Sequence, residues 1–271
     1  MDWLVAAAFV LVGVLEIAVP LALAFVFARR FGIGKKLFLY GALFFVAVQV
    51  LHAPLMIFSQ GPLAESLKAA GFDGIAAFGI ISLYLGLLAG LFEEIGRFIV
   101  FKKFFPQKKL EASRENGLMF GAGWGGIESM IIGGLVFLAL FSYLEAAPLT
   151  AQQVSDLNTA QGGKLTANDV QTYQQQITAL MNVKPFDVLL GLFERLMTIS
   201  LHLCWTLLVL AAVAKKKNSL LWLAVAWHAA TDAGILFIAY ASQSALLAEG
   251  ALFIFCIPAI WYLWKNRPGK A

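Results

Sequence analysis

The stretch LFEEIGRF, residues Leu91–Phe98, places two adjacent carboxylates and an arginine inside a run that is otherwise apolar over residues 74–101. An ionised side chain at membrane depth costs at least ~2.5 kcal/mol on insertion scales, so three of them so close together require a reason. Glu93 and Arg97 are four residues apart and Glu94 and Arg97 three apart, so a helix places all three on one face. Arg97 can therefore hold one carboxylate while the other stays free for chemistry. The structural alternative is a buried ion pair that fixes helix packing.

The whole chain has the composition of a polytopic membrane protein. Of its 271 residues, 61% are hydrophobic and 13% are charged, whereas soluble domains are about 45–50% apolar. Apolar runs long enough to span a bilayer, roughly 20 residues, occur seven times, at about 3–28, 36–59, 75–101, 117–144, 185–214, 219–241 and 248–264. We therefore predict an all-α bundle of seven transmembrane helices that forms a single integral membrane domain over residues 1–271.

The basic residues predict how the chain is oriented. Fifteen of the 20 Lys and Arg residues follow the first, third, fifth and seventh runs, whereas Lys68, Lys164 and Lys184 alone lie in the alternate connections. An excess of Lys and Arg marks cytoplasmic connections, so we predict an outside N-terminus and a cytoplasmic C-terminus. Because the basic residues lie at the ends of apolar runs, the net charge of +4 does not indicate a nucleic-acid partner.

Two connections are predicted to lie on the outer side. The stretch 60–74 is predicted to be a short connection, and 145–184 is the sizeable polar region, rich in Gln, Thr, Asn and Ala. Thr166 with Asp169 resembles a capping box. Apolar residues follow it at helical spacing: Val170, Tyr173, Ile177 and Leu180. We predict an amphipathic helix that packs on the outer face of the bundle; a cap that receives substrate is the alternative.

Ionisable residues on four of the predicted helices fall at a similar depth. Counted from the predicted inner ends of these helices, they lie ~12–21 Å from the cytoplasmic surface at 1.5 Å per residue. They are Glu93 and Glu94, Glu128 in GAGWGGIES, His202 in HLCW, and His228 and Asp232 in WHAATD. We therefore expect these side chains to meet in one layer, in a polar cavity that water reaches from the cytoplasmic side.

Two kinds of chemistry suit this set of residues. A carboxylate beside a neutral imidazole can take a proton from water, and a second imidazole with an acid one turn later, His228 and Asp232, can stabilise an oxyanion or hold a ligand. Alternatively, His202, His228 and Glu93 form the ligand set of a catalytic zinc that keeps one open position. The residues alone do not choose between these alternatives.

The other polar positions predict structural roles. The glycine run Gly121–Gly126 favours close helix packing, with room for an unfolded peptide as the alternative. His52 lies near the outer end of its run, where a helix kink or an interfacial position is favoured. Glu194 and Arg195 are adjacent and cannot share a helix face, so they need partners on other helices. Glu16 has no evident partner.

The order of these motifs resembles a known family. EEIGR on one helix, a glycine-rich helix ending in Glu128, a histidine in HLCW and then HAATD are similar to the YhfC family of intramembrane peptidases. More distantly, the motifs resemble the PrsW proteases and the type II CAAX prenyl endopeptidases. The resemblance covers about residues 75–235. It implies an intramembrane endopeptidase of a bacterial or archaeal cytoplasmic membrane, whose partners are the lipid bilayer and a membrane-embedded peptide or protein substrate.

The resemblance also implies roles for individual residues. Glu93 or Glu94 would be the general base that activates water, with His202 beside it. Arg97 would orient the second glutamate, and Glu128 would support the site. His228 and Asp232 would stabilise the oxyanion.

Two departures from the motifs of these families limit which of their properties the resemblance implies for this chain. The CAAX enzymes use EExxxR, with one more residue, and have a histidine in their second motif, so a prenylated substrate does not follow. Asp232 stands where an asparagine is common; a protonated Asp could donate a hydrogen bond, whereas an ionised one would suit a metal or His228.

We favour glutamic-type catalysis without a cofactor and place a zinc-dependent variant second. The rivals from other classes are a proton-coupled transporter, in which the same residues relay protons, and a non-catalytic protein that binds a membrane peptide. Seven spans do not divide into the inverted halves common in transporters, so hydrolysis is favoured.

Overall fold

The computed structural model of the protein describes residues 2–146 and 150–265, and over these residues every regular element is helical. Seven helices are long and apolar enough to cross a membrane. They are α1 (Trp3–Phe31), α2 (Lys36–Ala69), α3 (Gly74–Ile99) with its continuation, α5 (Arg114–Glu145), α8 (Pro185–Ala214), α9 (Asn218–Ser242) and α10 (Ala245–Lys265). The predicted all-α bundle with seven spans is confirmed. Arg267 and Lys270, which entered the count of basic residues, lie outside the described residues.

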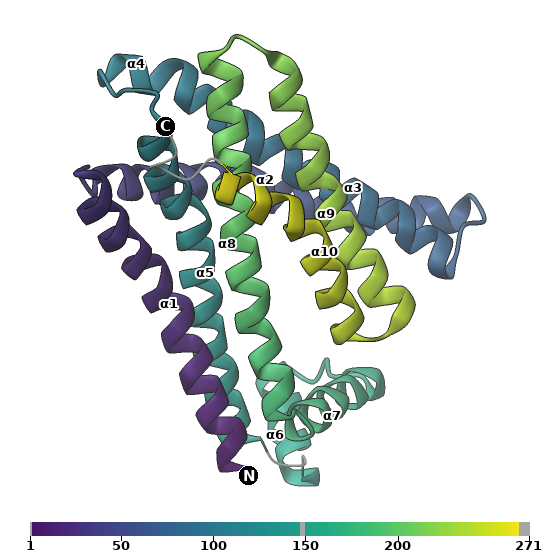
Figure 1. The fold of residues 1–271 in the computed structure, drawn as a ribbon. Helices are drawn as coiled ribbons and strands as arrows, with labels where there is room; N and C mark the ends of the chain where they lie inside the picture. The colour runs from purple at the N-terminus through teal and green to yellow at the C-terminus, as the bar shows by residue number, and fades with distance from the viewer. Residues whose placement is uncertain (1, 147–149, 266–271) are drawn as a thin grey trace.

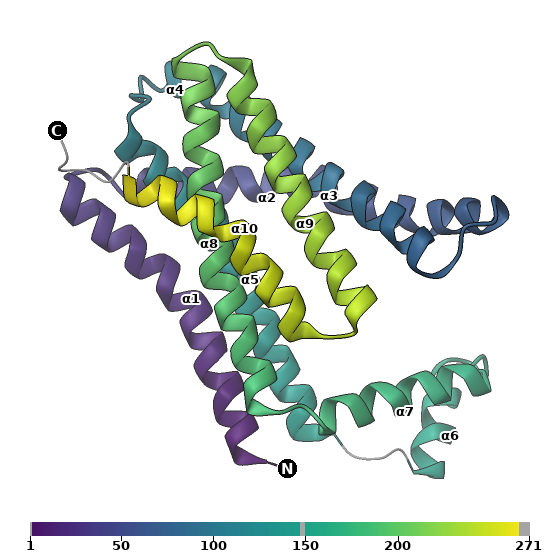
Figure 2. The same cartoon turned by 45° about the vertical axis from the view of Figure 1, so that its right-hand side comes forward.

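Helix α8 lies at the centre of the bundle. It contacts α1, α3, α5, α9 and α10, and most of its apolar stretch is buried, whereas less than half of the apolar stretch of each other spanning helix is buried. Around it, α1 lies along α5 and α3 lies along α9, while the α2–α3 hairpin extends sideways from the bundle (Figures 1 and 2). The largest cluster of buried apolar side chains runs along α8 and includes Leu201, Trp205 and Val209.

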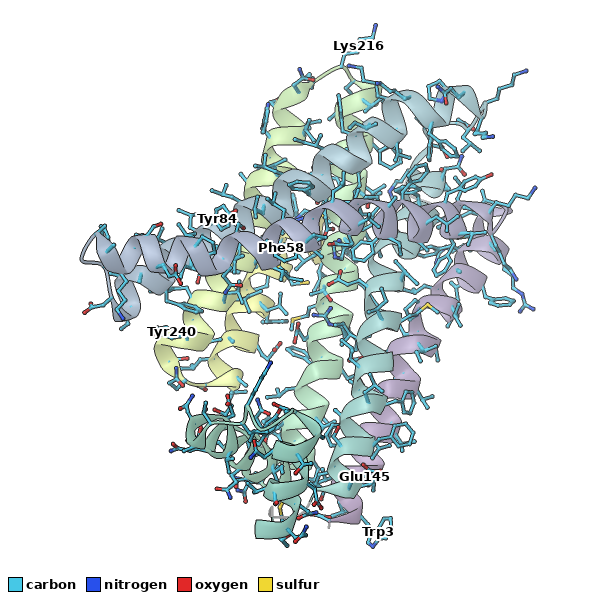
Figure 3. The ribbon with its side chains drawn as sticks, turned by 180° about the vertical axis from the view of Figure 1, so that it is seen from behind. Trp3, Phe58, Tyr84, Glu145, Lys216 and Tyr240 are labelled. Carbon is cyan, nitrogen blue, oxygen red and sulfur yellow. The ribbon has the colours of Figure 1, made fainter. Side chains whose placement is uncertain are left out.

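The basic and the polar connections between the helices lie in two groups, at opposite ends of the molecule. The turn between α8 and α9, marked by Lys216, lies at the opposite end of the molecule from Trp3 and Glu145 (Figure 3). The chain after α1 and the α4 region also lie away from the N-terminus (Figure 1). The basic connections therefore lie away from the end that carries the N-terminus and the polar segment.

Two helices are longer than the hydropathy pattern predicts. Helix α2 continues to Ala69, so the predicted outer connection 60–74 shortens to a turn. Its last residues, LAESLKA, are good helix formers, which explains the extension. Helix α3 continues through a π-helical turn, Val100–Phe104, into α4 (Phe105–Gln107). The turn is closed by the N–H of Phe105, which donates to the carbonyl of Val100.

The polar segment forms two helices, α6 (Ala151–Ala160) and α7 (Ala167–Met181). The predicted capping box is present: Thr166 and Asp169 each accept the other's backbone N–H, and the bonds from Thr166 lower the pKa of Asp169. No residue of α7 is buried, and Leu180 near its end packs on the cluster formed by α1 and α5. The helix prediction therefore holds, but α7 covers little of the bundle. Residues 147–149 of the segment lie outside the described residues.

The glycine run on α5 lets other helices approach closely. A Cβ added at Gly123 would lie 1.9 Å from the carbonyl oxygen of Phe38 on α2, and one added at Gly125 would lie 2.8 Å from Cβ of His202 on α8. Neither separation is sterically allowed. These glycines therefore set helix packing next to a predicted site residue, which agrees with the packing interpretation of the run.

Replacing Gly125 by alanine should destabilise the protein by about 1–3 kcal/mol, because the new methyl group must push α5 away from α8. Thermal unfolding of the detergent-solubilised protein measures the change. Gly134→Ala is the matched control, since a Cβ at that position on the same helix meets nothing within 4 Å. Equal unfolding temperatures for the two variants would contradict the packing role of Gly125.

Candidate active site

Arg97 lies at the centre of the charged group on α3. It is completely buried, and its guanidinium donates through Nη1 to Oε1 of Glu94 and through Nη2 to Oε2 of Glu93 at 3.2 Å. The hypothesis that Arg97 leaves one of these carboxylates free is therefore wrong. The two prongs of a guanidinium reach both neighbours on the same helix face.

Glu93 is held by two further donors from other helices. Nε1 of Trp124 on α5 donates to Oε2 at 2.9 Å, and Nε2 of Gln49 on α2 donates to Oε1 at 3.1 Å. The ring of Trp124 also lies 4.4 Å from the guanidinium carbon of Arg97, a cation–π contact. A carboxylate offers about four acceptor positions, so Glu93 keeps room for one more donor, such as a water molecule.

His52 belongs to this network rather than to the bilayer interface. Its Nδ1 lies 2.9 Å from Oε1 of Gln49, and its ring stacks on Phe92 at 5.4 Å. The amide oxygen of Gln49 can only accept, so Nδ1 of His52 donates to it. His52 thereby orients the amide that donates to Glu93, a role that the kink or interfacial interpretation missed.

His202 lies between the charged groups of α3 and α5. Its Nδ1 is 2.6 Å from Nη2 of Arg97, and its Nε2 is 2.7 Å from Oε2 of Glu128. Because a guanidinium can only donate, Nδ1 must accept, and Nε2 therefore carries the proton that it donates to Glu128.

His228 on α9 has a carboxylate beside each ring nitrogen, whereas His202 has a guanidinium beside one nitrogen and a carboxylate beside the other. Its Nδ1 is 2.7 Å from Oε1 of Glu94, and its Nε2 is 3.5 Å from Oδ2 of Asp232 one helical turn later. Carboxylates on both sides favour a doubly protonated imidazolium. The ring also stacks on Trp205 at 4.0 Å, which suits a cation because the face of an indole is electron-rich.

A cavity of about 260 Å³ gives access to this network. Side chains from α3, α5, α8 and α9 line it: Glu93, Glu128, Arg195, His202, His228 and Asp232. Glu128 and Asp232 are the most open of the predicted site residues, with side-chain exposures of 28% and 35%, whereas Glu94 is fully enclosed. Glu94 and Arg97 therefore lie behind the cavity wall.

The lining residues also indicate the direction of the cavity. Along α8 and α9 it extends from the two histidines toward Glu194 and Leu236, away from the basic turn at 215–217. The cavity therefore extends away from the basic turn, the end of the bundle from which water was predicted to enter.

Several residues near the site were not predicted from the sequence or were expected to have only a structural role. Gln49 is an amide in an apolar run, a signal that was present, and Trp124 stands within the glycine run that drew attention to Glu128. Arg195, expected to be structural, donates from Nη1 to Oε1 of Glu128 at 3.0 Å. Its Nη2 donates to Glu194, so the inference that both of these adjacent residues need partners on other helices is wrong, because a long arginine side chain can bend back to its neighbour. Glu16 is buried on α1, and its carboxylate has no hydrogen-bond partner within residues 2–146 and 150–265.

A zinc ion held by His202, His228 and Glu93 does not fit the side chains as they are arranged. Zinc binds the bare lone pair of an imidazole nitrogen. In His202 one nitrogen accepts from Arg97 and the other carries a proton, and in His228 both nitrogens face carboxylates. Within the described part of the chain, no three His, Cys, Asp or Glu side chains form a group that could hold a metal ion.

Comparisons with known proteins agree with the resemblance drawn from the order of the motifs. The sequence profile of a family described as YhfC intramembrane metalloprotease matches residues 15–254, which include every predicted site residue. The chain is also similar to the uncharacterized membrane protein YhfC of Bacillus subtilis (strain 168), with 31% identity over 220 residues that cover 80% of this chain and 78% of the relative. No solved structure gives a significant match.

Proposed function

The chain belongs to the YhfC intramembrane metalloprotease family, and from this premise we propose that it hydrolyses a peptide bond in or near a membrane-embedded segment by means of water activated by glutamate and histidine. The family makes the protein an integral membrane protease. The glutamic-type mechanism, the roles of the residues and the outward N-terminus are our proposal.

The observation that carries the proposal is the position of His202 between two carboxylates that line one cavity. Its ring nitrogens lie 3.9 Å from Oε2 of Glu93 and 2.7 Å from Oε2 of Glu128. Both carboxylates keep free acceptor positions, so a water molecule in the cavity can be held by the two together. Glu93 takes one proton from this water as the new oxygen–carbon bond forms at the substrate carbonyl.

The remaining groups serve the later stages of the reaction. The carbonyl oxygen becomes an oxyanion, which Nε2–H of the His228 imidazolium stabilises from the cavity wall. Glu93 then gives its proton to the leaving nitrogen as the carbon–nitrogen bond breaks, so a carboxylic acid and an amine result and Glu93 is ionised again. Arg97 and Glu94 hold Glu93 and His228 in place, and Arg195 holds Glu128.

The description of the family as metalloproteases keeps a zinc-dependent reaction as the second candidate. The donor types are suitable, but zinc would have to displace the protons on His202 and His228 and separate His202 from Arg97. Since the contacts oppose that change, we place the metal-free reaction first.

Cleavage of a set of transmembrane peptides by the purified protein, with and without a strong chelator, tests the choice between the metal-free and the zinc-dependent reaction. We expect cleavage that the chelator does not reduce and that His202→Ala abolishes, with Lys216→Ala on the exposed turn as the control. Cleavage that chelation removes and only added zinc restores would establish the metal-dependent alternative. If no peptide is cleaved while an imposed proton gradient drives uptake of a solute, the protease assignment falls in favour of transport.

A further inference from the structure

A second cavity lies at the other end of the bundle from Trp3, where α5 begins and where α8 and α10 end. Its volume is about 200 Å³, and it shares no lining residue with the proposed active site. Its polar groups come from three helix ends: Arg114 at the start of α5, Lys215 directly after α8, and Tyr262 in the last turn of α10.

Arg114 is half-buried and is not paired as the two buried arginines are. Arg97 and Arg195 each contact two carboxylates. Arg114 instead makes one long bond from Nη2 to the carbonyl oxygen of Leu263, at 3.4 Å. Its Nε and Nη1 are enclosed and have no hydrogen-bond partner in the part of the chain that the structure describes. Enclosed, charged donors without an acceptor are costly, so this guanidinium is suited to an acceptor that a ligand supplies.

The chemistry of the wall identifies the class of that ligand. Arg114 and Lys215 supply positive charge, and among the described residues no carboxylate lines the cavity. The fork of a guanidinium matches two oxygens of a phosphate group. The opposite wall is apolar, formed by Leu207, Leu210 and Ala214 of α8. A free phosphate ion has nothing to place against that wall, whereas a phospholipid has its glycerol and acyl chains.

The place of the cavity agrees with this chemistry. It lies beside the basic turn 215–217, at the ends of helices that are long and apolar enough to cross a membrane. Basic pockets between transmembrane helices on the cytoplasmic side, where the basic connections are predicted to lie, bind anionic headgroups. We propose that this cavity binds the phosphate group of an anionic phospholipid, with Arg114 and Lys215 as the two cations that recognise it.

Binding is tested on the full-length protein in neutral detergent, with thermal unfolding followed by tryptophan fluorescence. Three additions are compared at equal concentration: phosphatidylglycerol, phosphatidylcholine and inorganic phosphate. We expect phosphatidylglycerol to raise the unfolding temperature saturably and the other two to have little effect. Arg114→Gln should weaken the apparent affinity about tenfold or more, because it removes a charge-assisted hydrogen bond.

Other variants keep the test decisive if Arg114→Gln does not fold. Lys215→Gln should also weaken binding, whereas Lys216→Gln, on the neighbouring exposed residue, should not. Glu115→Gln should strengthen binding, because this carboxylate acts electrostatically on Arg114 and competes with the ligand. Equal effects of phosphatidylglycerol and phosphatidylcholine, or unchanged affinity in Lys215→Gln, would overturn the site. Equal affinity for inorganic phosphate would overturn the lipid as its occupant.

Discussion

Replacing Arg97 by glutamine should cost about 3–5 kcal/mol of stability, the usual result of removing one partner of a buried ion pair. Arg97 is fully buried and is the cation that pairs with both Glu93 and Glu94. Without it, two carboxylates remain in the bundle interior with only neutral donors and His228 beside them. The midpoint of thermal or denaturant unfolding in detergent measures the loss.

Two further variants show whether the loss comes from the unpaired charge. Arg29→Gln, at an exposed position near the end of α1, should leave the midpoint unchanged. Adding Glu94→Gln to Arg97→Gln should recover part of the stability, because it removes one of the stranded charges. If Arg97→Gln unfolds at the wild-type midpoint, then Arg97 does not hold this group together.

The variant Glu93→Gln should lower kcat by about 10²–10⁴-fold, the usual contribution of a general base, while changing KM little. Glutamine keeps the size of the side chain and can still accept from Trp124, but it cannot take a proton from water. Cleavage kinetics on a defined transmembrane peptide provide the measurement. Glu65→Gln on the exposed end of α2 is the matched control.

The same assay shows which of the two carboxylates that line the cavity, Glu93 or Glu128, is the general base. Glu128→Gln should also lower kcat strongly, because in the proposed mechanism Glu128 holds the water, and its carboxylate is the partner of Nε2 of His202. A normal kcat in Glu93→Gln together with a large loss in Glu128→Gln would make Glu128 the base. Normal rates in both variants would remove the proposed mechanism.

Much of the fold followed from the sequence because the bilayer imposes it. A spanning helix needs about 20 apolar residues, and this requirement alone gives the seven helices. Spacing along one helix predicted that Glu93, Glu94 and Arg97 share one face, but not that Arg97 contacts both carboxylates. Counting from the helix ends predicted that α3, α5, α8 and α9 bring their ionisable residues together. The resemblance to the YhfC family, drawn from the order of the motifs, is confirmed by the match over residues 15–254.

What the sequence did not predict depends on how each helix is rotated about its axis. Hydropathy gives the depth of Trp124 and Gln49 but not the direction in which they point. Their bonds to Glu93 exist because α2 and α5 approach each other at Gly123, which brings the adjacent Trp124 to the interior. The partner of Arg195 on α5, Glu128, was hidden for the same reason.

On the mechanism proposed above, the hydrogen bonds of His202 and His228 bear on which inhibitors would suit the site. Hydroxamates act by chelating a metal, and here they would meet two imidazole rings whose nitrogens already face hydrogen-bonding partners. A compound that mimics the tetrahedral intermediate is better matched. One of its hydroxyls would donate toward Glu93 and Glu128, and an oxygen bearing negative charge would accept from His228. Attached to an apolar, helix-like tail, such a compound would mimic both the tetrahedral intermediate and the membrane-embedded segment of the proposed substrate.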